Sequence, residues 1–211
     1  MRRAVLCGGA VVILAGGVQG DETIGPWTVR APDAAGAIVD LGGSWGWLNI
    51  VDAAVDVDTA FSGESILDDG YANASTGQEI EVLFFTPVVN VVGPDLVMFD
   101  ARFDEGEYAI SSDFDGFTAT TALGVGDFID TGEDRDYFYE LNDDGPFFAD
   151  IWGAEIDLSD IGVPLGSSVT VLHFISTNGA TDPIGMGAIV PAPGTIALLA
   201  LGGIAGIRRR R

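Results

Sequence analysis

The sequence predicts an antiparallel β-sandwich over residues 21–185, flanked by an apolar segment at each end of the chain. The central part alternates β-rich runs with Gly, Asp and Pro turn signals about every 8 to 15 residues, a spacing typical of sandwiches and barrels. No amphipathic run of helical period exceeds two turns, and the 30 glycines favour tight turns. The candidate strands are 37–40, 45–51, 79–85, 95–99, 107–111, 117–121, 137–141, 148–152 and 169–176.

Residues 1–20 have the pattern of a secretory signal peptide. Two arginines precede an apolar run that ends near Val18, and Gly20 is a small residue at the expected cleavage position. The only cysteine, Cys7, lies within this leader, so the processed domain can form no internal disulfide. We therefore expect export of the domain that follows.

The charge of the central domain excludes one class of partner. It carries three arginines against all 32 acidic residues of the chain, a net charge of −29, and the chain has no lysine. Nucleic-acid binding relies on cationic side chains that displace counterions from phosphates. We expect no nucleic-acid partner, and we expect the charge to favour solubility and to attract cations.

The C-terminal end predicts a membrane segment. Residues 186–194 form a Pro/Gly linker, and residues 195–211 are an apolar run that ends in four arginines. The thirteen apolar or small residues of 195–207 cover only about 20 Å as a helix, against about 30 Å of hydrocarbon core. By the positive-inside rule the arginines stay in the cytoplasm, which places the acidic domain outside.

This tail resembles the PEP-CTERM sorting signal. Its matching residues are Pro191, Ala192, Pro193 and Gly194, the apolar run, and Arg208, Arg209, Arg210 and Arg211. The resemblance implies that an exosortase, a membrane transpeptidase-like enzyme, cuts near the motif and transfers the protein to the cell surface or into exopolysaccharide. Ala192 stands where the family usually has Glu. A permanent tail anchor is the alternative.

Two stretches of the domain, 93–117 and 156–184, resemble the discoidin-like, or galactose-binding-like, jelly roll. Each combines a short strand with a Gly, Pro or Asp turn. The resemblance implies a jelly-roll-like sandwich of about eight antiparallel strands, an architecture that hosts sugar binding, matrix adhesion and scaffolding alike.

The residue inventory nominates no catalytic residues. Without lysine, and with no cysteine outside the leader, the domain has no Schiff-base amine and no thiol nucleophile. The only histidine, His173, alternates with Val171 and Ile175 in a strand-like run, which favours a core or edge position. A carboxylate-dependent glycan hydrolase stays open as the alternative, because it needs only two carboxyl groups about 5 to 10 Å apart.

Calcium is the one metal that the sequence favours, because hard cations prefer clustered oxygen ligands. The candidate ligands lie in turn-like clusters and are Asp113, Asp115, Asp130, Asp134 and Asp136. None of the clusters has the spacing of an EF-hand, and solvated turns are the competing interpretation.

Three tryptophans could bind carbohydrate, because an aromatic face stacks on the apolar side of a sugar ring. These are Trp45, Trp47 and Trp152, and packing in the core is the competing interpretation. The sequence therefore predicts a non-enzymatic protein of the cell surface or extracellular matrix, with carbohydrate or matrix binding as its more specific form.

Overall fold

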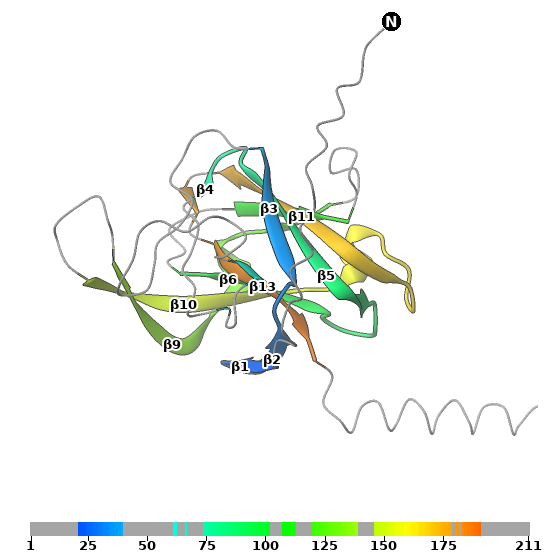
Figure 1. Ribbon diagram of the computed structural model, residues 1–211, viewed down its shortest axis with the longest axis horizontal. Coiled ribbons are helices and arrows are strands. Elements are labelled where there is room, and N and C mark those ends of the chain that lie inside the picture. The colour runs from blue at the N-terminus through cyan, green and yellow to red at the C-terminus, as the bar shows by residue number, and fades with distance from the viewer. Residues whose placement is uncertain are drawn as a thin grey trace, which may run out of the picture.

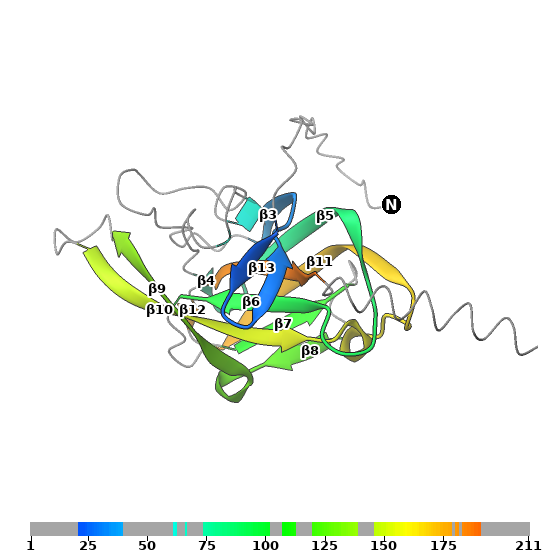
Figure 2. The same ribbon diagram turned by 90° about the horizontal axis from the view of Figure 1, so that it is seen from below.

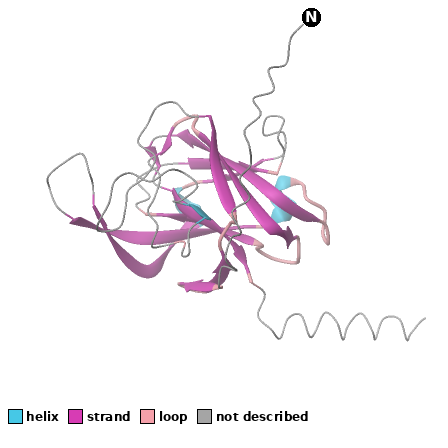
Figure 3. Ribbon diagram, in the orientation of Figure 1, coloured by secondary structure: helices cyan, strands magenta, loops and turns pink. Residues whose placement is uncertain are grey.

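The computed structural model describes residues 21–39, 61–62, 66, 74–101, 107–112, 120–138, 146–178, 180–181 and 183–190, and strands dominate them (Figures 1 and 3). The strands are β1 (Glu22–Ile24), β2 (Trp27–Arg30), β3 (Ala34–Val39), β4 (Ala74–Ser75), β5 (Glu79–Val89), β6 (Leu96–Asp100), β7 (Glu107–Ser111), β8 (Thr120–Leu123), β9 (Phe128–Phe138), β10 (Pro146–Ile156), β11 (Ser168–Asn178), β12 (Ala180–Thr181) and β13 (Pro183–Ile189). Two short 3₁₀ helices, η1 (Val125–Asp127) and η2 (Leu158–Ile161), interrupt them.

The strands form two main antiparallel sheets, which confirms the predicted all-β class. One has the order β1-β2-β13-β6-β10-β9, the other has the order β3-β5-β11-β7-β8, and β12 and β4 form a separate pair. The predicted leader and the predicted sorting tail lie outside the described residues. Within the described ranges, no helix is long and apolar enough to cross a membrane.

The main core lies between the two large sheets, and strand alternation builds it. In β5, Ile80, Val82 and Phe84 are buried in the core cluster. In β11, Leu172 and Phe174 join the same cluster. Because side chains of a strand alternate between its two faces, the residues between them point away from this core. The alternation that predicted these two strands from the sequence therefore also sets their inner face.

Strand β6 is buried on both faces. Leu96 and Met98 belong to the core between the sheets, whereas Val97 and Phe99 belong to a second cluster. A strand that reads as a continuous apolar run is typical of one covered on both sides. The outer face of the six-stranded sheet therefore has its own cover.

The β1–β2 hairpin forms much of that cover, and Ile66 adds to it over Gly185 and Gly187. Residues Val29 and Arg30 pair with the end of β13, while at the hairpin tip a Cβ on Gly25 would lie 3.0 Å from Thr131 of β9. The hairpin thus crosses the outer face of the sheet, as Figure 2 shows from below. Its two-residue loop, Gly25–Pro26, has a positive φ of 55° at the glycine, as the first central position of a type II′ turn requires.

Two glycines let the hairpin lie directly on the sheet. A Cβ on Gly153 would lie 2.5 Å from the Trp27 ring, and a Cβ on Gly187 would lie 2.7 Å from the Cβ of Val29. The Trp27 indole Nε1 also donates a hydrogen bond to Glu155 Oε1 over 2.7 Å. These contacts fix the hairpin, although β2 pairs with β13 at only two positions.

The structure corrects the sequence prediction at β9. The segment 130–136, which we expected to be a turn-like acidic cluster, lies inside this eleven-residue strand, and the strand predicted at 137–141 begins nine residues earlier, at Phe128. Asp130, Asp134 and Asp136 pair with β10, but the register shifts between Asp130 and Asp134, where Gly132 has a φ of 76°. Charged side chains on an edge strand are a common protection against pairing with another chain.

Candidate functional site

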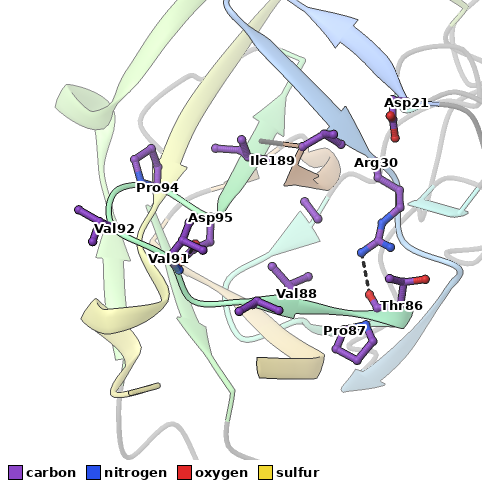
Figure 4. Close-up of a pocket in the computed structure, with 13 residues that line it drawn as sticks. Asp21, Arg30, Thr86, Pro87, Val88, Val91, Val92, Pro94, Asp95 and Ile189 are labelled. Atoms are coloured by element: carbon purple, nitrogen blue, oxygen red, sulfur yellow. Dashed lines mark hydrogen bonds between the residues drawn. The ribbon is translucent and has the colours of Figure 1, made fainter. Parts of the chain in front are cut away.

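The described residues enclose a pocket of about 450 Å³ at one end of the sandwich (Figure 4). It lies between the end of β5, the loop that follows it, and the ends of β2 and β13. The lining residues are Asp21, Arg30, Thr86, Pro87, Val88, Val89, Val91, Val92, Pro94, Asp95, Ala188, Ile189 and Val190. The volume falls in the range of small-molecule pockets, which is about 300 to 1,000 Å³.

The pocket wall is mostly hydrocarbon. Its valines come from β5, from the turn at Gly93–Pro94, where Gly93 has a φ of 97°, and from Val190 directly after β13. Val92 at the tip of this turn is 89% exposed, and Val89 is 49% exposed. Exposed apolar side chains around a concave surface are a common feature of ligand-binding sites.

Arg30 supplies a guanidinium group to this apolar wall. Its Nη2 donates a hydrogen bond to the Thr86 backbone oxygen over 2.6 Å, which is the dashed line in Figure 4. Its Cζ lies 5.8 Å from the centre of the Phe84 ring, a cation–π distance. The Nε of Arg30 is buried and has no hydrogen-bond partner. The hydrogen bond and the ring contact hold the guanidinium against the pocket wall.

Asp95 is the second polar group of the pocket, and its role is structural. It is 3% exposed, and its carboxylate accepts hydrogen bonds from the backbone N–H of Val91 over 2.9 Å and of Leu158 over 3.0 Å. Burial raises the pKa of Asp95 above its ordinary value of 3.8, and these two hydrogen bonds oppose part of that rise. The carboxylate ties the loop after β5 to the start of η2.

Replacing Asp95 by asparagine should change the pH dependence of stability. Because the pKa of Asp95 is raised in the folded domain, this group adds stability at acid pH and loses that contribution as the pH rises through the raised value. We therefore expect the free energy of unfolding of the wild type to rise relative to that of Asp95→Asn as the pH falls from about 7 toward 4. Urea denaturation across this pH range measures the difference in free energy of unfolding, or gap, between the wild type and the variant. Asp160→Asn, at an exposed carboxylate nearby, is the control, and a gap that does not vary with pH would contradict the assignment.

His173 lies on the outer face of the five-stranded sheet, between two carboxylates. Its Nδ1 is 3.1 Å from Glu79 Oε1, and its Nε2 is 3.6 Å from Glu81 Oε2, which is an ion-pair distance but too long for a good hydrogen bond. In the sheet register His173 stands opposite Glu81 on one side and Ser111 on the other. His173 is 2% exposed and Ser111 is fully buried, so these two side chains are removed from solvent and are not accessible to a substrate.

The other predicted site residues fall in three groups. Trp152 lies in β10 and packs, half-buried, against the main core, so that its ring is largely taken up by protein contacts. Asp130 lies in β9, where its Oδ1 accepts a hydrogen bond from the Gly132 N–H over 2.8 Å. Asp134 and Asp136 share that strand, and their side chains are outside the described part. Outside the described residues altogether are Trp45, Trp47, Asp113, Asp115 and the sorting-signal residues.

Among the residues that the structure describes, no group of three or more His, Cys, Asp or Glu is arranged to hold a metal ion. The calcium hypothesis therefore has no assembled site in these ranges, and its clusters at 113–115 and 134–136 stay predictions.

No family model, no curated protein and no solved structure matches this chain. The functional argument therefore depends on the residues of the molecule itself.

Proposed function

We propose that this is an exported, non-enzymatic structural or binding protein of the cell surface or extracellular matrix, processed at its PEP-CTERM-like tail by an exosortase-type enzyme. The membrane holds the precursor through the apolar segment 195–207 before the cut. This kind of processing implies exopolysaccharide as a partner of the mature protein. The sandwich is jelly-roll-like in this proposal, and its pocket is the binding site.

One geometric observation carries the proposal. Asp21, which would be the first residue after the predicted leader, and Val190, the last described residue before the sorting motif, line the same pocket. Both predicted membrane-directed segments therefore leave the domain at one end. In Figure 1 β13 ends near the bottom of the view, close to the β1–β2 hairpin, whereas the hairpin of β9 and β10 extends to the left. A domain tethered in this way would present the β9–β10 end away from the membrane.

The arrangement of buried carboxylates favours a binding role over the hydrolase alternative. In the described ranges, Asp95 and Asp100 are the buried acidic residues. Asp95 directly precedes β6 and Asp100 is its last residue, so the two are five positions apart. In an extended strand this separation is about 16 Å. Glycosidases need their two carboxyl groups within about 10 Å. The Asp95 carboxylate also already accepts hydrogen bonds from two backbone N–H groups.

Mass spectrometry of the protein recovered from cells tests the proposal. The expected mature form lacks residues 1–20 and about the last 15 to 20 residues, because the short apolar span and its arginines stop transfer while the prolines keep the cutting region extended. Replacing Pro191 and Pro193 by alanine should leave uncut protein in the membrane. Neutralising residues 208–211 should release unprocessed chains.

The matched control is Pro87→Ala, because Pro87 is an exposed proline of β5 outside the tail, and we expect this variant to be processed normally. Chains that end in Arg211 at the surface of normal cells would refute processing and leave only the tail anchor.

A further inference from the structure

We infer that, in the uncut precursor, the pocket end of the domain docks on the outer surface of the membrane, and that the lipid it contacts is electrically neutral. The contact is made by an exposed apolar patch that consists of Val89, Val92 and Leu165. The inference rests on the proposed membrane hold of the precursor and adds to it a direct contact between the folded domain and lipid.

The three side chains of the patch lie close together at one end of the sandwich. Their exposed fractions are 49% for Val89, 89% for Val92 and 65% for Leu165, and within the described ranges only two other large apolar side chains are exposed. The Gly166 N–H donates a hydrogen bond to the Asn90 carbonyl over 2.9 Å, which brings Leu165 beside the loop after β5. In Figure 4, Val92 lies on this loop at the border of the pocket.

The sequence around the patch is free of charge. The segments 85–94, 161–168 and 186–194 contain no Asp, Glu, Arg or Lys, although the domain has 32 acidic residues. Contact of these segments with lipid therefore removes no ionised side chain from water, which would be costly. Asp21 in the pocket lining and the net charge of −29 still repel anionic head groups. A neutral lipid surface is therefore the favoured partner.

The linker to the membrane segment is too short to hold this end of the domain far from lipid. Val190 lines the pocket, and the predicted apolar segment begins at Thr195. Five residues span at most about 18 Å when fully extended. A short tether gives the patch a high effective concentration of membrane surface. A patch of three side chains, too weak to bind membranes on a free protein, is sufficient under these conditions.

A second copy of the chain fits the patch less well than lipid does. Stable protein interfaces bury about 800 Å² on each partner, more than three side chains offer, and two domains of charge −29 repel each other. Docking on lipid also has a consequence for the pocket. Because Val89 and Val92 belong to its lining, the membrane covers part of the pocket rim in the precursor, and cutting of the tail uncovers it.

Fluorescence quenching of the full chain in phosphatidylcholine nanodiscs, assembled with one chain per disc, tests the inference. The only cysteine of the chain is removed by Cys7→Ser. A fluorophore on Ser167→Cys, an exposed position near Leu165, should be quenched by nitroxide-labelled lipid. A fluorophore on Thr76→Cys should stay unquenched, because β5 runs from Glu79 to Val89 and separates the two ends by about 33 Å.

Three variants locate the contact. Val92→Asp and Leu165→Asp should each lower the ratio of docked to undocked domain, read from the quenched fraction of the Ser167→Cys label, at least about tenfold. A tenfold change corresponds to about 1.4 kcal/mol, which is less than full burial of one valine contributes. Ile129→Asp, at an exposed apolar residue of β9 outside the patch and the pocket lining, is the matched control and should leave the ratio unchanged. Circular dichroism shows that each variant is folded.

Co-elution of the chain with the discs reports the membrane hold, and quenching reports the docking, so the two failures are distinguishable. A chain that does not co-elute would refute the membrane hold and the inference with it. A co-eluting chain with an unquenched Ser167→Cys label would overturn the inference alone. So would an equal loss of quenching in Ile129→Asp, which would be a general effect of charge. Quenching that appears only in discs holding two chains would assign the patch to a second copy and overturn the lipid contact.

Discussion

Trp27→Ala should lower the free energy of unfolding by about 3 to 5 kcal/mol, the usual cost of removing a large buried aromatic side chain. Trp27 is 5% exposed, meets the edge of Phe99 at a ring separation of 6.0 Å, and donates to Glu155. The change removes all three contacts at once. Chemical denaturation measures the loss.

Two companion variants separate the causes of this loss. Thr28→Ala changes the neighbouring exposed position of β2 and should cost much less. Trp27→Phe keeps a ring but removes the N–H donor, so its cost should lie between those of the other two variants. Equal stability of Trp27→Ala and Thr28→Ala would show that the hairpin contributes little to holding the sheet together.

Tyr108→Phe should cost about 1.5 to 3 kcal/mol, the range for a hydrogen bond to a charged group. The Tyr108 hydroxyl donates a short hydrogen bond to Asp100 Oδ2, and both residues are fully buried. Phenylalanine preserves the ring contacts with Phe128 and Phe174 and removes only the oxygen. Equilibrium denaturation measures the change.

A double-mutant cycle with Asp100→Asn isolates the coupling between the two residues. Asparagine still offers the Tyr108 hydroxyl a neutral acceptor, so Tyr108→Phe should cost less in that background than in the wild type. The same cost in both backgrounds would mean that the carboxylate charge adds nothing to this hydrogen bond.

The sequence predicted the parts of the fold that depend on alternation and turns. The strands expected at 79–85, 107–111 and 169–176 correspond to β5, β7 and β11. In each of them the side chains that face the core are apolar, so the pattern of a half-buried strand is visible without the tertiary structure. His173 is buried, but it lies in a central strand on the face opposite the main core, between Glu79 and Glu81, and not in the core or at an edge of the sheet.

The sequence did not predict the strands whose formation depends on pairing with neighbouring strands rather than on alternating apolar residues. β13 contains Pro183, Gly185 and Gly187, residue types that are poor in isolated strands. It forms because β6 and β2 pair with it on either side, and Gly187 leaves room for Val29. The β1–β2 hairpin was marked only by its Gly25–Pro26 turn, with very short strands around it.

The pocket was not predicted because its parts are far apart in the chain. Arg30 lies 56 residues from Thr86, and Asp95 lies 63 residues from Leu158. One signal was available: Arg30 is one of only three basic residues in a domain with 32 acidic ones. A rare cation in such a domain is a candidate for a specific role, but only the folded chain shows that apolar side chains surround it.

The β1–β2 hairpin has a consequence for the order in which the domain assembles. It is the first part of the domain to be synthesised, yet it packs on Gly153 and Gly187, which are made near the end. Its apolar residues Ile24, Trp27 and Val29 therefore have no docking surface while the chain is growing. Contacts between such distant parts of a chain form slowly. We therefore expect the second core to close only after the strand that carries Gly187 has been made.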